Sequence, residues 1–205
     1  MEYKDYIKSE YCVAYEQERA YLEDRLLESK YNLLFLKMLY ERGEAYRQNH
    51  GITERHGIRI IIRRIYITVA WELALQIKAI TVDNDSDSLT INKFKNNVFR
   101  YIKTEKKQEY YNSLGLITKT PDWRICERLV SSISDYRNQI VGHNIVNAPK
   151  LKFDIEDADF VIAQYERVFH VLCFQNEKYT ERSMDIDNEM TGYITDYLDA
   201  LLPLN

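Results

Sequence analysis

The spacing of apolar residues along the chain predicts helices over most of its length. From residue 2 to about residue 48, Glu, Lys, Arg, Leu and Ala dominate, and the leucines recur at helical steps. A second apolar series, from Ile58 to Ile80, is rich in β-branched residues, which suit strands. It is too long for one strand, however, and its apolar residues recur at steps of three and four. We therefore predict a long N-terminal helix within residues 1–50 and a central, mostly buried helix from Ile58 to Ile80.

Four further helices are predicted from turn and capping signals. They span Thr90 to about Tyr111, Asp122 to the region of His143, Asp154 to about Gln175, and Ser183 to Leu202, with a connection from Ser113 to Pro121. Thr120 followed by Pro121 is typical of a helix N-terminus, and Asp154 and Ser183 are the expected N-capping residues of the last two helices. The pattern as a whole predicts an all-α, antiparallel helical bundle of about six helices.

The composition favours one soluble helical domain. The 205 residues include 6 Gly and 3 Pro. Together these make up about 4% of the chain, against roughly 12% in average proteins. An all-β fold with many tight turns is therefore disfavoured. The hydrophobic fraction of 45% and the charged fraction of 29% are those of a globular chain. We expect a single domain over residues 1–205, with a core bundle over 58–179 and a C-terminal helix over 183–202.

The charge and the cysteine content limit the cellular compartments and the kinds of binding site that fit this sequence. The net charge of −4 does not indicate a nucleic-acid binder, so such a site would have to be a local patch. Three scattered cysteines without CxxC spacing argue for a reducing compartment. The N-terminus lacks the apolar core of a signal peptide, and the sequence has no apolar run of membrane-spanning length. We expect a cytoplasmic protein without membrane contact and, since neither a metal-ligand pattern nor a Gly-rich phosphate loop is present, without a metal or cofactor.

The strongest candidate for chemistry is the segment SDYRNQIVGHN, residues 134–144. Arg137 lies four residues after Ile133 and three before Ile140, so it projects from the apolar face of its helix. An unpaired buried guanidinium is unfavourable, and Arg137 therefore requires an acidic partner, an anion or a wet cleft. His143 follows six residues later, about 120° away around an ideal helix. Either Gly142 redirects the imidazole, or two copies of the helix meet and contribute to one cleft.

RNA strand scission is the reaction that suits these side chains. Histidine exchanges protons near neutral pH with a 2′-hydroxyl or a leaving oxygen. Arg137 can hold a phosphate and stabilise the charge of the transition state, and the amide of Asn138 can position either group. The structural alternative is that Arg137 pairs with a buried carboxylate and that His143 caps a helix C-terminus.

The residues from Arg137 to His143 resemble the R-N-(four residues)-H signature of the HEPN superfamily, the higher eukaryotes and prokaryotes nucleotide-binding domains. The segments WELALQIKAITVDNDSDSLTINKF (71–94) and DYRNQIVGH resemble its AbiU-like abortive-infection branch, and the likeness covers about Ile58 to Tyr179. Gly142 departs from that branch, which often has Ala there. The resemblance implies a helical bundle that dimerises through the motif helices.

For function, the resemblance implies a metal-independent endoribonuclease of a defence, abortive-infection or toxin–antitoxin system. Arg137, Asn138 and His143 would be its catalytic residues, RNA its substrate and a second copy of the chain its partner. The alternatives are a non-catalytic HEPN module that binds RNA, nucleotide or a protein partner, and an antitoxin-like or regulatory subunit encoded beside an enzyme.

A basic run offers a second candidate for RNA contact. It consists of Lys93, Lys95, Arg100, Lys103, Lys106 and Lys107. Glu105 is the one acid among these cations, and phosphate backbones are attracted to such a patch. Phe94, Phe99 and Tyr101 are interleaved with it. The structural alternative is a solvated helix face whose aromatic rings point inward.

Overall fold

The computed structural model describes residues 3–51, 57–82, 88–142, 154–174 and 177–204. In these ranges the chain forms seven α-helices: α1 (Cys12–His50), α2 (Gly57–Thr81), α3 (Ile91–Tyr101), α4 (Lys107–Thr118), α5 (Pro121–Gly142), α6 (Ile155–Leu172) and α7 (Glu177–Leu201). Short 3₁₀ turns lie at Tyr3–Asp5, Ser9–Tyr11 and Thr104–Lys106. The predicted all-α bundle is confirmed, with seven helices in place of about six.

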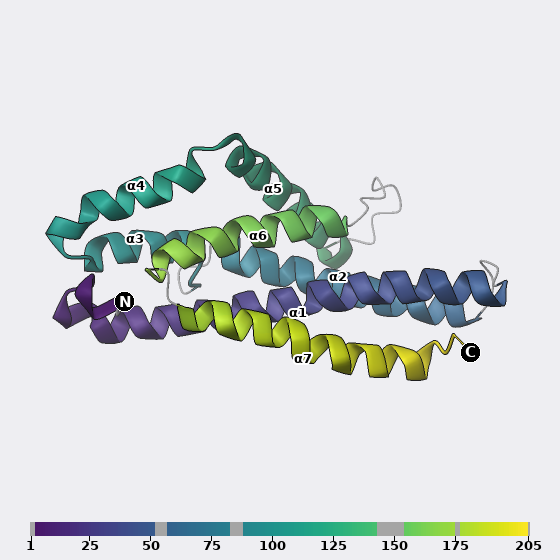
Figure 1. Cartoon of the computed structure of the whole chain (residues 1–205). Coiled ribbons are helices and arrows are strands. Elements are labelled where there is room, and N and C mark those ends of the chain that lie inside the picture. Colours follow the sequence, from purple (N-terminus) through teal and green to yellow (C-terminus); the bar gives the residue numbers. More distant parts are fainter. Residues whose placement is uncertain (1–2, 52–56, 83–87, 143–153, 175–176, 205) are drawn as a thin grey trace.

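The long helix α1 runs the length of the bundle and contacts most of the other helices (Figure 1). Helix α2 returns antiparallel beside it, whereas α7 runs in the same direction as α1 along its C-terminal part. Helices α3 and α6 pack on α1, and α4 and α5 lie on α6. Helix α5 also packs on α2, so the helix that carries the candidate motif is held mainly by α2 and α6.

The buried residues form two apolar clusters that share α1. The larger joins the N-terminal part of α1 to helices α2 to α6, and its largest fully buried side chains include Tyr15, Phe94, Tyr165 and Phe169. The smaller contains Leu39 of α1 with Ile194, Leu198 and Leu202 from the α7 end of the chain. Apolar burial is the main favourable term in folding, and on α2 the buried residues lie only in the second half, from Ala70 to Thr81. The prediction of a mostly buried helix from Ile58 to Ile80 is therefore wrong for its first half, where Ile60, Ile61 and Ile67 are exposed.

Two of the predicted helix starts are confirmed by their capping hydrogen bonds. The hydroxyl of Thr120 accepts a hydrogen bond of 3.2 Å from the backbone N–H of Trp123, directly before α5. The carboxylate of Asp154 accepts one of 2.9 Å from the N–H of Glu156 at the start of α6. Both bonds satisfy donors that a helix N-terminus leaves unpaired.

The prediction of one continuous helix from Thr90 to about Tyr111 is wrong, because the chain turns at Ile102. This residue has extended backbone angles (φ −68°, ψ 144°) and pairs antiparallel with Ile7. Two backbone hydrogen bonds of 3.0 and 2.9 Å flank the pair, and both isoleucine side chains are buried. These contacts replace the hydrogen bonds that a continuous helix would have made, and α3 and α4 therefore form separately.

Other predicted boundaries also need correction. Helix α1 begins at Cys12 and not near residue 2. Helix α4 continues to Thr118, so the connection predicted from Ser113 is mostly helical. Helix α7 begins at Glu177, which places the predicted N-cap Ser183 inside the helix. None of the helices, within the described ranges, is both long and apolar enough to cross a membrane.

Candidate functional site

The first half of α5 is anchored in the core. Trp123, Cys126, Val130 and Ile133 are buried at steps of three and four, as the amphipathic pattern of this helix requires. The ring of Trp123 lies 5.1 Å from that of Tyr165 on α6, centroid to centroid. Burial raises the pKa of the Cys126 thiol to about 12, so this cysteine is an uncharged core residue. The helix is therefore positioned by its first three turns.

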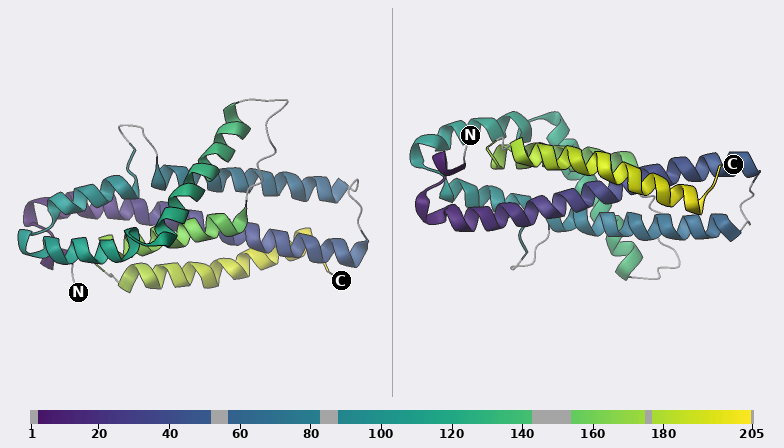
Figure 2. Two further views of the ribbon diagram at one scale, coloured as in Figure 1. Left: turned by 90° about the horizontal axis from the view of Figure 1, so that it is seen from above. Right: turned by 60° about the horizontal axis from the view of Figure 1, so that its bottom comes forward.

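The last turns of α5 carry the candidate motif. Arg137 and Asn138 lie in this part of the helix, which ends at Gly142. Figure 2 (left) shows that the C-terminal end of α5 extends past α2 and projects from the bundle. His143, the third candidate catalytic residue, lies outside the described residues. The two catalytic candidates within α5 are thus carried on a helix end that leaves the core.

A buried hydroxyl marks the point where the motif segment begins. The Oγ atom of Ser134 is buried, and the described part of the chain offers it no hydrogen-bond partner. The side chain of Asp135, the next residue, is exposed. Buried polar groups normally have partners, so an unsatisfied hydroxyl beside a candidate site is notable. The buried face of the helix therefore reaches Ser134, close to the start of the projecting end.

The six cations of the basic run lie on different elements and make different contacts. Phe94 and Tyr101 are buried, as the structural alternative expected, whereas Phe99 is 42% exposed. Lys93 and Arg100 lie seven residues apart on one side of α3, and Lys95 lies on another side. The other three cations make separate contacts. Lys103 donates hydrogen bonds to the carbonyl oxygens of Lys4 and Asp5, and Lys106 donates one to Glu109. The ammonium of Lys107 lies over the ring of Phe99. Within α3, Lys95 therefore lies on a different side from Lys93 and Arg100.

Lys93 and Arg100 share an open pocket with Glu18 of α1. Its volume is about 590 Å³, and Glu18, Ser88, Leu89, Lys93, Asn96, Asn97 and Arg100 line it. The Glu18 carboxylate accepts hydrogen bonds from the amide of Asn97 at 3.0 and 3.1 Å and from the hydroxyl of Tyr101 at 3.0 Å. The sequence pattern did not indicate this pocket, because Glu18 is 79 residues from Asn97.

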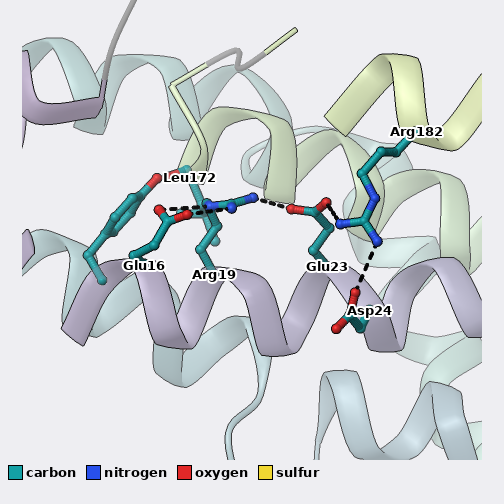
Figure 3. Close-up of polar contacts among 7 residues, drawn as sticks. Glu16, Arg19, Glu23, Asp24, Leu172 and Arg182 are labelled. Atoms are coloured by element: carbon teal, nitrogen blue, oxygen red, sulfur yellow. Dashed lines mark hydrogen bonds and ion pairs between the residues drawn. The ribbon is translucent and has the colours of Figure 1, made fainter. Parts of the chain in front are cut away.

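A second charged cluster lies between α1 and α7 (Figure 3). Glu23 is 2% exposed and accepts hydrogen bonds from both Arg19 and Arg182. Arg19 also bonds to Glu16 at 2.7 Å, and Arg182 to Asp24 at 3.2 Å. Each arginine faces two carboxylates, so the cluster is internally paired and joins the two helices. Arg182 thus links the start of α7 to α1.

Two further titratable groups, His170 on α6 and Cys173 directly after it, are shifted toward their neutral forms. Burial lowers the pKa of His170. The negative charge of Glu166 raises this pKa in part, and the positive charge of Lys30 lowers it further. Burial raises the pKa of Cys173, so this thiol is also neutral at physiological pH. The described residues contain no group of His, Cys, Asp and Glu arranged to hold a metal ion.

No family model matches the chain, and comparisons with curated proteins and with solved structures find no significant match.

Proposed function

We propose that the protein is a HEPN-like, metal-independent endoribonuclease of a defence or toxin–antitoxin type system, with an active site shared by two copies of the chain. The observation that carries the proposal is the position of Arg137 and Asn138 in the projecting last turns of α5. His143 follows one residue after the helix ends. A motif suited to RNA cleavage therefore coincides with a helix end that substrate or a second subunit can approach.

The chemistry follows from the side chains. One His143 accepts the proton of an RNA 2′-hydroxyl, and the resulting oxygen attacks the adjacent phosphorus. The bond from phosphorus to the 5′ oxygen breaks, and the His143 of the second copy donates a proton to that leaving oxygen. Arg137 holds the phosphate oxygens and stabilises their added charge, while Asn138 positions the reacting groups. The products are a 2′,3′-cyclic phosphate and a 5′-hydroxyl.

An exposed apolar surface supports the proposed homodimer. Ile60, Ile61 and Ile67 are 51%, 50% and 40% exposed on α2, the helix on which α5 packs. Exposed apolar patches often mark protein interfaces. These isoleucines lie in the first half of α2, away from the part that α5 crosses (Figure 2, left), so a second copy that covered them would pack along α2.

The test is RNA cleavage in EDTA by purified wild-type protein and by Arg137→Ala and His143→Ala variants. Arg128→Ala is the matched control, because Arg128 is an exposed cation on α5 outside the motif. We expect wild type and control to cleave equally and both motif variants to lose roughly 100-fold or more. Equal cleavage by all four proteins, or by none, would refute the proposal. RNA binding without cleavage would favour the non-catalytic module.

A further inference from the structure

The open pocket between α1 and α3 is built from a hydrogen-bonded network. We call the seven residues that line it, from Glu18 to Arg100 as given above, the α3 groove. Both oxygens of the Glu18 carboxylate accept hydrogen bonds from Asn97, and Asn97 in turn accepts one from Arg100. Lys93 donates to the carbonyl oxygen of Ser88 at 2.7 Å and to its hydroxyl at 3.2 Å. The two cations are therefore held in place.

The one acid of the groove is directed toward its own neighbours. Glu18 accepts bonds from Asn97 and from the hydroxyl of Tyr101. Burial, the hydrogen bond to Glu18 and the charge of that carboxylate raise the pKa of Tyr101, so its hydroxyl stays a donor at neutral pH. The carboxylate thereby orients the amide that holds Arg100, and the groove presents mainly N–H donors.

Cations and an aromatic ring continue along the same surface beyond the groove. The ammonium of Lys8 donates to the carbonyl oxygen of Arg100 at 3.2 Å and lies 5.6 Å from the ring centroid of Tyr11. Tyr11, which is half-buried, stacks on Tyr101 at 4.8 Å between ring centroids. Residues from the N-terminal segment and from α3 thus form one strip of three cations with a flat aromatic ring.

We propose that the α3 groove, with Lys8 and Tyr11, binds the phosphodiester backbone of single-stranded RNA. This inference rests on the proposed function, for which the strip is a second contact with the substrate, away from the motif on α5. Phosphate groups are attracted to fixed cations, and bases stack on aromatic rings without regard to sequence. The openness of the groove favours a strand that runs across it, because pockets for small ligands enclose most of the ligand.

The test is equilibrium binding of a short fluorescent single-stranded RNA, measured by anisotropy at several salt concentrations. All proteins carry His143→Ala and the buffer contains EDTA, so the RNA stays intact. Arg100→Ala and Lys93→Ala are compared with Arg47→Ala, which removes an exposed cation at the other end of α1, about 40 Å from Glu18 at 1.5 Å per residue. Melting curves check that each variant is folded.

We expect each groove variant to weaken binding roughly fivefold and to reduce the salt slope by about one, while Arg47→Ala binds like the parent. Groove variants that are folded and bind like the parent would overturn the proposal. Displacement of the RNA by adenosine monophosphate or inorganic phosphate at a matched phosphate concentration would also overturn it, in favour of a small-ligand site.

The outcomes for the groove and for the enzyme are separable. If wild-type protein cleaves no RNA while binding still depends on Arg100 and Lys93, the proposed nuclease function fails and the groove stands. If wild-type protein cleaves RNA while both groove variants bind and cleave normally, the groove fails and the nuclease stands.

Discussion

Substitution of Glu23 by alanine tests how α7 is held on α1. The Glu23 side chain is 3% exposed and pairs with Arg19 and Arg182, whose side chains are 15% and 55% exposed. Removal of one partner from a buried ion pair typically costs 3–5 kcal/mol, because the other charge remains buried. Here Arg19 keeps Glu16, and Arg182 can turn to solvent. We therefore expect Glu23→Ala to lower the free energy of unfolding by about 2–3 kcal/mol, below the full value for a buried pair.

Arg182→Ala removes the exposed member of the same contact. Surface ion pairs contribute about 0–1 kcal/mol, and Arg19 still neutralises Glu23 in this variant. Its loss in unfolding free energy should therefore be about 1 kcal/mol or less. Glu28→Ala, an exposed glutamate on α1, is the matched control and should change stability by no more than about 0.5 kcal/mol.

The assay is urea unfolding followed by far-ultraviolet circular dichroism, with thermal melting as a second measurement. At roughly 2–4 °C per kcal/mol for a domain of this size, Glu23→Ala should melt about 4–12 °C below wild type. If Arg182→Ala and Glu23→Ala lower stability equally, the exposure argument is wrong. If neither differs from Glu28→Ala, the cluster contributes nothing to the docking of α7.

Three further predictions concern the helix cap, the interface and the pH response. Thr120→Ala removes the N-cap of α5 and should lower the free energy of unfolding by about 1 kcal/mol in the same urea assay, whereas no change would show that the cap is unimportant. Substitution of Ile60 and Ile67 by aspartate should convert the proposed dimer to a monomer in light scattering, and an unchanged mass would place the interface elsewhere. Burial raises the pKa values of Tyr15 and Cys126 above those of the unfolded chain, about 10 and 8.5. Their contribution to stability is therefore complete at neutral pH and is lost as pH rises above about 8.5, so the melting temperature should fall in alkaline buffer and a flat profile would contradict this.

Local signals predicted much of the fold. The helical spacing from Ile58 to Ile80 and the caps at Thr120 and Asp154 depend on neighbouring residues alone, and the structure confirms all three. The break at Ile102 was missed because it depends on pairing with Ile7, a contact between residues far apart in the chain. Tertiary contacts override local helix propensity in such cases.

The candidate site also has some features that the local sequence predicts and others that only the packed structure reveals. The sequence placed Arg137 and Asn138 correctly near the end of a helix, and the role of His143 stays a prediction. The basic run was read as one patch, whereas helical geometry turns Lys95 away from Lys93 and Arg100. The partner that orients Arg100 through Asn97 is Glu18, which comes from a different helix and carries no motif. Residues that act through a distant neighbour leave no local pattern, and only the packed structure brings them together.

The most direct test of the proposed nuclease is the chemistry of its product ends. Wild-type protein is incubated with RNA in EDTA, and the fragments are identified by mass spectrometry beside those from the Arg137→Ala and His143→Ala variants. Attack by the 2′-hydroxyl predicts fragments with a 2′,3′-cyclic phosphate at one end and a 5′-hydroxyl at the other, absent from both variants. Fragments with 5′-phosphate and 3′-hydroxyl ends, or no fragments from any RNA, would contradict the account.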